Sequence, residues 1–324
     1  MLDRHAPLPA LVLTAGLATR LRPLSLVRAK AVLPVAGEPL ARRILRSLRE
    51  AGTTDAVLNL HHLPASITSR IGDGRDLDMR VRYSWESPVL GSAGGPRRAL
   101  AILGSPTFLI VNGDTLTDVP IGEVVAHHRR TRALVTMAVV PNTEPAKYGG
   151  VLVDSEDRVT GFVGCGSGRP SFHFVGVQVA EAEAFGSVPL NAPFESVGAL
   201  YPALIHARMG SVMACRTSAT FFDIGTPADY AATSFRLAPQ NDAWWQGART
   251  RIHPSSTLRR TVLWDDVIVG ADVRLDDCVV CDNVEVPAGS EWRHAIIRAA
   301  GTDLLPQERQ EGNLAISQLP PLPR

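Results

Sequence analysis

The sequence predicts an α/β fold: a Rossmann-like, mostly parallel mixed sheet with covering helices, followed by a short left-handed parallel β-helix. Two observations lead to this prediction. Over residues 10–236, apolar runs of strand length alternate with segments of helical periodicity. Over residues 252–297, apolar side chains instead recur at every sixth position, which is the repeat of a three-sided coil.

The bulk properties favour an ordinary globular protein. A chain of 324 residues can hold one large α/β domain and a small second one. Its formal net charge is +1, so the composition gives no sign of nucleic acid or an anionic membrane as a partner. No apolar run approaches the roughly 18 residues of a membrane-spanning helix. We therefore expect neither nucleic acid nor membrane as a partner.

The chain has four cysteines, Cys165, Cys215, Cys278 and Cys281. A chain of this length with so few cysteines needs no disulfide framework, which favours a cytoplasmic location. Cys278 and Cys281 form a CxxC, but no second pair of ligands follows at a zinc-binding spacing. We interpret this pair as residues of the six-residue repeat.

The alternating region opens with an apolar strand at 10–13. A helix then starts at Pro39 and is capped by Gly52, because proline fits the first helical turn and glycine the C-terminal cap. The next expected strands are 56–60, 81–86, 108–111 and 134–140, with helices at 63–71, 97–103 and 121–131. Such βαβ alternation predicts a ligand crevice at the carboxyl ends of the strands.

After residue 147 the pattern changes. The segments 151–153, 159–163 and 172–179 are typical of antiparallel strands separated by turns. Helical patterns return at 196–208 and 228–237. A second layer of this kind often forms the far wall of a ligand pocket.

Two sets of apolar residues carry the six-residue period: Leu263, Val269, Leu275 and Cys281, and Val267, Val273 and Val279. Both sets are expected to point into one narrow core. Ile252 and Leu258 keep the period one residue out of phase, so the first turn is expected to be irregular. The alternative is a two-stranded meander with chance periodicity.

These patterns predict four segments: a catalytic domain at 1–237, a linker at 238–251, the β-helix at 252–300 and a flexible tail at 301–324. A core of two to three turns leaves apolar surface at its open ends. We therefore expect the β-helix to dock on the catalytic domain, and we expect the chain to form a homo-oligomer.

The end of the first strand has the composition of a phosphate-binding loop. Gly16 follows the strand directly, and Thr19, Arg20 and Lys30 come after it. A glycine allows backbone N–H groups to approach an anion closely, and the cations neutralise its charge. The Walker pattern GxxxxGK[ST] is absent, so this is a different kind of phosphate site.

Two further motifs end in aspartate. The first is NGD at 112–114, which places Asp114 at the carboxyl edge of the sheet. The second is FFDIGTPADY at 221–230, in which Asp223 follows an aromatic strand and precedes a turn into a helix. Two carboxylates suit Mg²⁺, which prefers hard oxygen ligands.

In this order, the three motifs resemble those of the sugar-phosphate nucleotidyltransferases, or NDP-sugar pyrophosphorylases. That family opens with LAAGxGTRLxPLTxxxPKxLxPV and closes with FxDIGTPxxY, and the resemblance covers about 11–230. Ala18 departs from the pattern where a second glycine is usual, and Ala29 where a proline usually precedes the lysine. The family's EKP lysine, which binds the sugar phosphate, is also missing from the run 161–167.

The resemblance implies specific site residues. Catalysis would rest on Arg20, Lys30, Asp114 and Asp223, of which Asp114 and Asp223 would hold a catalytic Mg²⁺. The nucleotide would be bound by Leu13, Ala15, Gly16, Thr19, Arg20, Gly91, Ser92, Gly94 and Asp114. The sugar phosphate would be bound by Gly150, Gly176 and Glu195.

The resemblance also implies an activity: a nucleoside triphosphate and a sugar 1-phosphate give pyrophosphate and an NDP-sugar. GTP and mannose 1-phosphate are the favoured substrates, because an LGSAG turn and a β-helix after a short catalytic domain are common among mannose-1-phosphate guanylyltransferases. Uridylyl or thymidylyl transfer to another hexose 1-phosphate is the first alternative. The second is a catalytically weak regulatory subunit that senses nucleotide sugars, which the three departures would favour.

Overall fold

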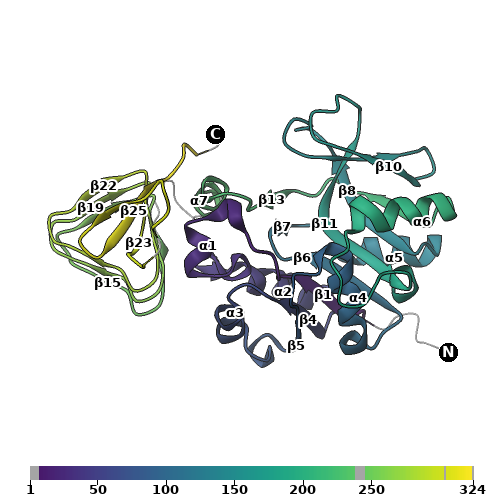
Figure 1. Cartoon of the computed structure of the whole chain (residues 1–324), viewed down its shortest axis with the longest axis horizontal. Coiled ribbons are helices and arrows are strands. Elements are labelled where there is room, and N and C mark those ends of the chain that lie inside the picture. Colours follow the sequence, from purple (N-terminus) through teal and green to yellow (C-terminus); the bar gives the residue numbers. More distant parts are fainter. Residues whose placement is uncertain (1–6, 238–244, 303, 323–324) are drawn as a thin grey trace. The chain divides into compact units, whose positions relative to one another are not determined.

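The computed structural model describes residues 7–237, 245–302 and 304–322, and Figure 1 shows their elements. The chain divides into two compact units. The first comprises Met1–Gly16 and Ala41–Phe221, and the second comprises Leu17–Leu40 and Phe222–Arg324. The region predicted as one catalytic domain is therefore spread over both units.

The first unit contains a nine-stranded mixed sheet. Its main path runs β10–β9–β11–β6–β1–β4–β5, and β8 joins β11 and β12. The strands β1, β4, β5 and β6 are parallel, whereas β11 pairs antiparallel with β6, β8 and β9. The strands are β1 (Ala10–Leu13), β4 (Asp55–Leu60), β5 (Arg80–Trp85), β6 (Thr107–Asn112), β8 (Val135–Pro141), β9 (Gly150–Val153), β10 (Val159–Val163), β11 (Phe172–Glu181) and β12 (Val212–Arg216). The predicted fold class is confirmed.

The core of the first unit lies between this sheet and its helices. Leu11, Ile110 and Val139 of the strands belong to one buried cluster with Ala99 of α4 and Tyr201 of α6. The helices of the unit are α2 (Leu40–Glu50), α3 (Pro64–Ile71), α4 (Gly91–Leu103), α5 (Ile121–Thr131) and α6 (Tyr201–Ala207), with short turns η3 (Arg75–Leu77), η4 (Ala182–Phe185) and η5 (Ser196–Leu200) and the strand β7 (Thr115–Thr117).

Helix α4 begins six residues earlier than the expected helix at 97–103. Its first turns contain the glycine-rich run at 91–95, which the sequence pattern favoured as a turn. A Cβ on Gly94 would lie 2.7 Å from the carbonyl oxygen of Ala192, and one on Gly95 would lie 2.7 Å from Glu86 Oε1. These glycines therefore permit close packing within a helix, and tertiary contact outweighs their low helix propensity.

The second unit contains the predicted three-sided β-helix, consistent with a left-handed coil. Its three parallel sheets are β14–β17–β20–β23, β15–β18–β21 and β16–β19–β22. The strands are β14 (Trp245–Gln246), β15 (Arg251–Ile252), β16 (Thr257–Arg259), β17 (Val262–Leu263), β18 (Ile268–Val269), β19 (Arg274–Asp276), β20 (Val279–Val280), β21 (Glu285–Val286), β22 (Glu291–Arg293) and β23 (Ala295–Ala299). Because β14 pairs with β17, the coil begins within the predicted linker at 238–251.

Each full coil is 17 residues long rather than 18. Leu258 pairs with Leu275, and Leu275 pairs with Trp292. Ile252 and Leu258 pair with residues 17 positions later, so they seem one residue out of phase only when a repeat of 18 is assumed. The first coil is therefore regular, and the expectation of an irregular first turn was wrong. The inward residues Leu263, Val269 and Leu275 are six positions apart, but the next one, Val280, follows after only five. The side of the coil after Leu275 is therefore one residue shorter than the other two.

That missing residue changes which side chains enter the coil. Cys278 and Val280 belong to the inner core cluster, together with Val273 and Leu275. Val279 and Cys281, predicted to point inward, are fully buried but are not in this cluster. Because successive side chains of a strand face opposite sides, Val279 lies on the outer face of β20, and Cys281, two residues further on, points to the same side.

The outer face of this sheet packs on the rest of the second unit. Trp264 follows β17, is 0% exposed and meets Tyr230 of α7 (Pro227–Arg236) edge to face at 6.3 Å. The β-helix therefore docks on α7, which belongs to the predicted catalytic domain. The other elements of this unit are η1 (Thr19–Leu21), α1 (Leu24–Val27), η2 (Lys30–Val32), β2 (Pro34–Val35), β3 (Glu38–Pro39) and, at its boundary, β13 (Phe221–Asp223).

The expected flexible tail was wrong for most of its length. The strands β24 (Arg309–Glu311) and β25 (Leu314–Gln318) form an antiparallel pair, and β25 also pairs with β23. Leu314 and Ile316 enter the coil's core. The open edge of a strand can pair with another strand, and in this chain β25 covers the edge of β23.

A buried ion pair holds the segment before β24. Arg298 is 6% exposed, and its Nε donates to Glu308 Oε1 at 2.7 Å. Glu308→Ala leaves this guanidinium buried without its carboxylate, so we expect the free energy of unfolding to fall by about 3–5 kcal/mol in urea titrations. Glu291→Ala removes an exposed pair with Arg293 and should cost no more than about 1 kcal/mol. Equal losses would contradict a buried role for Glu308.

The four cysteines are free thiols. Cys278 donates to the carbonyl oxygen of Asp276 at 3.3 Å, and burial raises the pKa of its thiol to about 12. A thiol that stays protonated is a poor metal ligand, which agrees with the structural role predicted for the CxxC. Among the described residues, no helix is both long and apolar enough to cross a membrane.

Candidate active site

A cavity of about 240 Å³ lies at the carboxyl edge of the sheet in the first unit. Leu13 ends β1, Asn112 ends β6, and the two residues are in register. The cavity is lined by Leu13, Ala15, Gly16, Asn59, Glu86, Val89, Gly91, Ser92, Asn112 and Asp114. Six of the residues expected to bind the nucleotide are therefore together: Leu13, Ala15, Gly16, Gly91, Ser92 and Asp114.

Close packing of two backbones brings Asp114 to this cavity. Gly113 donates its N–H to the carbonyl oxygen of Leu13 at 3.0 Å. A Cβ on Gly113 would collide with that carbonyl and lie 2.9 Å from Thr14 Cγ2. The glycine of the NGD motif is thus required sterically, and the chain can turn at once to present the aspartate.

Two polar cavity residues, Asn59 and Glu86, were missed by sequence reasoning, as was the apolar Val89. Thr14 donates its backbone N–H to Asn59 Oδ1 at 2.6 Å, and Asn59 Nδ2 donates to Glu86 Oε1 at 2.7 Å. Glu86 Oε2 accepts from the N–H of Leu90 at 2.9 Å. This chain of bonds ties the ends of β1, β4 and β5 to the start of α4. Polar residues at two neighbouring strand ends were the available signal.

We expect Glu86→Ala to destabilise the first unit. Glu86 is 0% exposed, so its loss leaves two buried donors without an acceptor. Such unsatisfied groups cost about 1–3 kcal/mol each, so the free energy of unfolding measured in urea should fall by about 2–6 kcal/mol. Glu183→Ala, at an exposed glutamate of the same unit, should change it by less than about 0.5 kcal/mol. Similar values for both variants would refute a bracing role for Glu86.

Glu195, expected to bind the sugar, lies against the start of α4. Its Oε2 accepts from Ser92 Oγ at 2.6 Å, and a Cβ on Gly91 would lie 2.7 Å from its Oε1. Gly91 has a φ of +76°, so the position requires glycine for its conformation as well. Ser92, predicted to bind the nucleotide, is thus in direct contact with Glu195, predicted to bind the sugar. Gly94 does not line the cavity and instead packs on Ala192.

The two glycines expected near the sugar differ in position. Gly176 has a φ of +83° and lies in the irregular part of β11, where a Cβ would stand 3.0 Å from Asn112 Cβ. Gly176 therefore adjoins a residue that lines the cavity. Gly150 is in β9, packs tightly on Ser171 and does not line the cavity.

The other expected catalytic residues belong to the second unit. A Cβ on Gly225 would lie 3.5 Å from Asp223 Oδ2 and 3.6 Å from Arg20 Nη2, so Arg20 and Asp223 both border this glycine. Thr226 then caps α7, accepting from the N–H of Asp229 at 3.2 Å. The DIGTP motif is thus a strand end followed by a capped helix, with Asp223 partly exposed.

The loop that carries Thr19, Arg20 and Lys30 has an unusual backbone. Ala18 is left-handed, with φ 49° and ψ 43°. Glycine adopts this left-handed conformation most easily, which explains why the family pattern usually has glycine at this position. In this chain Ala18 adopts it instead. Thr19 and Arg20 are exposed in η1, and Lys30 opens η2 with its side chain half-buried.

A comparison with known families decides the identity. A family model described as nucleotidyl transferase matches residues 9–237. The chain belongs to this family. The predicted resemblance is thereby confirmed for the region that contains all three motifs.

Similar proteins are nucleotidyl transferases of several kinds. The mannose-1-phosphate guanylyltransferase of Mycobacterium tuberculosis is 29% identical over 292 residues, covering 86% of this chain and 81% of that protein. The mannose-1-phosphate guanyltransferase of Aspergillus oryzae is 27% identical, covering 86% and 82%. The UTP–glucose-1-phosphate uridylyltransferase of Synechocystis is 27% identical, covering 68% and 61%.

Solved structures share the nucleotidyl transferase fold. HddC from Yersinia pseudotuberculosis has a TM-score of 0.63 at 21% identity, covering 71% of this chain and 100% of HddC. A putative glucose-1-phosphate thymidylyltransferase from Bacillus anthracis also has a TM-score of 0.63, at 16% identity, covering 72% and 97%. These likenesses support the fold.

Asp114 and Asp223 each offer the hard carboxylate oxygens that Mg²⁺ prefers as ligands. Asp114 follows β6, Asp223 is the last residue of β13, and both side chains are partly exposed. Among the described residues, no group of three or more His, Cys, Asp or Glu could hold a metal by itself. Mg²⁺ is commonly held by one or two carboxylates and completed by water and phosphate oxygens, so a site for this ion in a nucleotidyl transferase needs no third protein ligand.

A larger cavity of about 710 Å³ lies in the first unit, beside the start of β6 and the residues before β8. Its cations include Arg132 and Arg208, which cap α5 and α6 at their C-termini, where positive charge is favourable. His128 is buried there and bonded to Glu181 at 3.0 Å. Helix capping and internal bonding account for these groups.

Proposed function

We propose that this protein transfers a nucleotidyl group from a nucleoside triphosphate to a sugar 1-phosphate, with GTP and mannose 1-phosphate as its substrates. The observation that carries the proposal is the similarity to mannose-1-phosphate guanylyltransferases over 86% of the chain. That similarity extends beyond the family match at 9–237. The cavity at the carboxyl edge of the sheet supports a ligand site in the crevice typical of such folds.

The reaction asks little acid–base chemistry of the protein. A sugar 1-phosphate is already an anion at neutral pH, so its oxygen can attack the α-phosphorus without a general base. Pyrophosphate then leaves in line, and the protein's work is to position the reactants and neutralise charge. The backbone after β1 and Arg20 would bind the triphosphate, and Lys30 would stabilise negative charge that develops at the α-phosphate.

Asp114 and Asp223 would hold Mg²⁺, which when bound supplies positive charge to the phosphate oxygens. Asp114 lies two residues after the end of β6, and Asp223 is the last residue of β13. Asp114 Oδ1 also accepts from Thr115 Oγ1 at 3.2 Å, which orients the carboxylate. Gly91, Ser92 and Glu195 would contact the base and sugar.

The missing EKP lysine needs a substitute. The loop after β10 is exposed, and both Gly166 and Gly168 have positive φ, at 76° and 68°. Glycines of this kind let consecutive N–H groups form an anion-binding nest. We propose that this nest or the exposed Arg169 takes the place of the lysine at the sugar phosphate.

A pyrophosphate-release screen tests the function. The full chain is assayed with ATP, CTP, GTP and UTP, each against a panel of sugar 1-phosphates in Mg²⁺. The highest kcat/KM is expected for GTP with mannose 1-phosphate. A preference for UTP with glucose 1-phosphate would favour the activity named for the Synechocystis relative. Nucleotide-sugar binding without turnover of any pair would favour the regulatory subunit.

We also propose a cytoplasmic homo-oligomer. The four free cysteines suit a reducing compartment. Self-association would cover the partly buried apolar residues of the first coil, Trp245, Ile252 and Leu258, since β25 already pairs with β23 at the other end of the coil. Light scattering on the full chain gives the mass, and a monomer at micromolar concentration would refute the assembly.

A further inference from the structure

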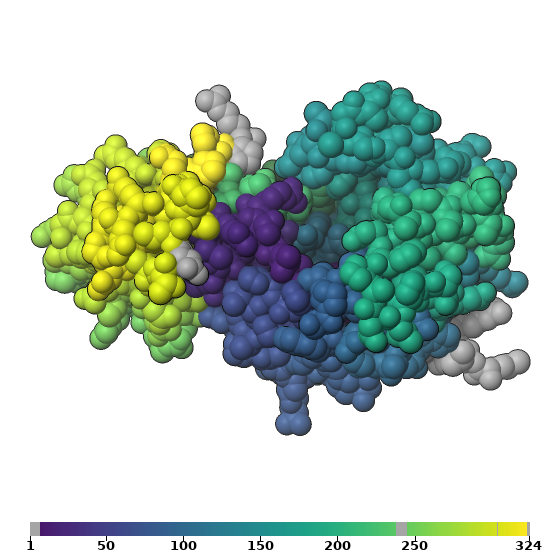
Figure 2. Space-filling view, viewed as in Figure 1, coloured from purple at the N-terminus to yellow at the C-terminus, as the bar shows by residue number. Residues whose placement is uncertain are grey.

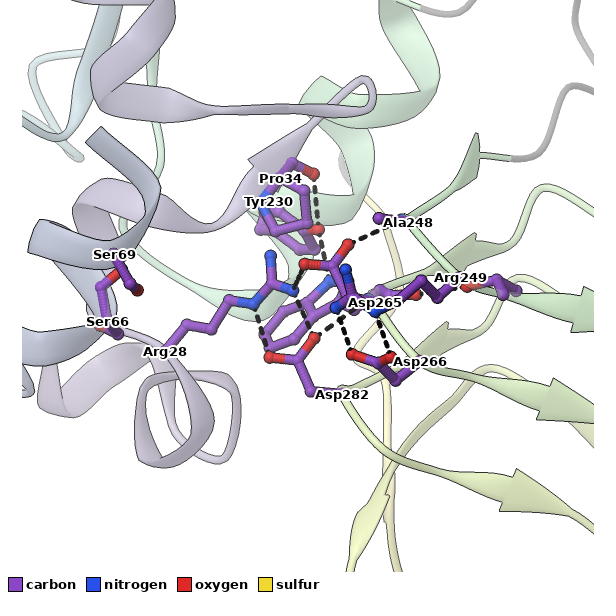
Figure 3. A network of polar contacts seen from close by, with 12 residues as sticks. Arg28, Pro34, Ser66, Ser69, Tyr230, Ala248, Arg249, Asp265, Asp266 and Asp282 are labelled. Carbon is purple, nitrogen blue, oxygen red and sulfur yellow. Dashed lines mark hydrogen bonds and ion pairs between the residues drawn. The ribbon is translucent and has the colours of Figure 1, made fainter. Parts of the chain in front are cut away.

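Arg28 is a buried cation that the proposed chemistry does not use. It is 2% exposed, and its Nε donates to Asp282 Oδ2 at 2.7 Å (Figure 3). Its Nη2 donates to Asp265 Oδ2 at 2.7 Å and also to the second oxygen of Asp282. The guanidinium carbon lies 5.0 Å from the centre of the Trp264 ring. Arg28 is thus held on three sides by the β-helix.

The acceptors are themselves fixed by the coil. Asp265 and Asp282 are 17 residues apart, so they occupy the same corner of successive coils. Asp265 Oδ1 accepts from the N–H of Ala248 at 2.8 Å, and Asp282 Oδ1 accepts from the N–H of Asp265 at 3.0 Å. Backbone N–H groups of the coil therefore orient both carboxylates in addition to Arg28, and Figure 3 shows the bond between Ala248 and Asp265.

A second link runs from the same side of the coil. Trp264 Nε1 donates to Tyr230 Oη at 2.9 Å, and Tyr230 Oη donates to the carbonyl oxygen of Pro34 at 2.8 Å. Trp264 and Tyr230 are both 0% exposed. In Figure 2, the purple segment that belongs to the second unit, residues 17–40, lies against the β-helix (yellow and green).

The two links bracket Lys30. Arg28 precedes it by two residues, and Pro34 follows it by four. Between them the backbone forms η2, with bonds from Val32 to Ala29 at 2.9 Å and from Leu33 to Lys30 at 3.2 Å. A 3₁₀ turn this short has little stability of its own, so its position depends on contacts with the rest of the unit.

We propose that the β-helix positions the Lys30 segment, residues 28–34, for nucleotidyl transfer, with Arg28 as a positioning residue. The role of Lys30 in this inference rests on the proposed function. A buried ion pair is a poor device for stability alone, because desolvation offsets much of its attraction. A bidentate guanidinium, in contrast, fixes direction and distance. The arrangement therefore fits placement of the segment better than simple stabilisation of the fold.

Kinetics of the full chain test the catalytic part. Arg28→Met keeps the apolar stem and removes the charge, and Asp282→Asn weakens the same contact from the β-helix. Each should lower kcat about tenfold or more, with KM for the triphosphate changed less than about twofold, because misplacement of a group that acts in the transition state affects turnover most. Assays are run well below the unfolding temperature of each variant.

Arg260→Met is the matched control. Arg260 Nε donates to Asp277 Oδ1 at 2.6 Å, and its guanidinium carbon lies 5.4 Å from the Phe235 ring of α7. Like Arg28, it is bonded to an aspartate of the β-helix and lies over an aromatic ring, but its ring contact is with α7 and, among the described residues, it makes no link to the Lys30 segment. We expect its kcat to equal that of the unaltered protein.

Hydrogen–deuterium exchange gives a readout that needs no turnover. In Arg28→Met the amides of Val32 and Leu33 should exchange at least about tenfold faster than in the unaltered protein, because opening of the segment becomes easier. In Arg260→Met their exchange should be unchanged. If Arg28→Met does not fold, kcat and amide exchange are measured on Asp282→Asn and Arg28→Lys instead.

Each outcome decides one part. Faster exchange with reduced kcat supports the inference. Unchanged exchange in Arg28→Met overturns the anchoring, and faster exchange with unchanged kcat overturns its catalytic consequence. An unaltered protein that turns over no substrate pair overturns the proposed function instead, while the exchange result still decides whether the β-helix holds the segment.

Discussion

Replacement of Asp114 or Asp223 by asparagine is expected to lower kcat at least about a hundredfold, since charge stabilisation is the main catalytic contribution in phosphoryl-type transfer. Asparagine keeps the size of the side chain and removes the negative charge that a magnesium ion needs. The measurement is steady-state pyrophosphate release at saturating substrates, with the Mg²⁺ concentration varied. A raised requirement for Mg²⁺ should accompany the loss of turnover.

Asp78→Asn is the control for this pair. Asp78 is exposed and has a φ of 52°, a conformation that asparagine adopts readily, so the exchange should not disturb the fold. Its kcat should match that of the unaltered protein. Near-normal turnover in a well-folded Asp114→Asn or Asp223→Asn would remove that residue from the metal site.

Lys30→Ala should reduce kcat by about a hundredfold and change KM for the triphosphate little. The reason is that its contact strengthens only as charge develops at the α-phosphate, so its loss raises the barrier more than it weakens substrate binding. Arg20→Ala should affect both constants, because Arg20 would grip the triphosphate before and during the reaction. Both variants are measured by initial rates over a range of triphosphate concentrations.

The pattern of constants is the test here. Arg274→Ala, at an exposed arginine of the β-helix, should alter neither constant. A Lys30→Ala protein that changes only KM would make Lys30 a uniform binding residue. An Arg20→Ala protein with unchanged KM would separate Arg20 from the ground-state triphosphate.

The strands and the motifs at their ends could be read from the sequence. The strands around Leu11 and Ile110 lie within one or two residues of their predicted bounds. Their buried apolar runs are local signals, and a strand end followed by glycine is local too. For this reason Gly16 and Asp114 could be assigned to one crevice before the fold was known, and the family resemblance added Leu13.

Residues whose role depends on a distant partner could not be read in this way. Asn59 and Glu86 become meaningful only when β1, β4 and β5 lie side by side. The start of α4 at Gly91 depends on how closely Glu86 and Ala192 approach its glycines. The coil length of 17 residues appears in the pairing of strands, whereas short sequence intervals match a period of six over only a few repeats.

The sequence by itself determined the fold class, the family and the order of the phosphate-binding and aspartate motifs. Only the tertiary structure decided that Arg28 is bonded to Asp265 and Asp282, partners more than 200 residues away. Periodicity and strand-end chemistry are written within about ten neighbouring residues, because they reflect local backbone geometry. A buried ion pair needs the whole fold to bring its members together and to exclude water from them, so no local pattern contains it.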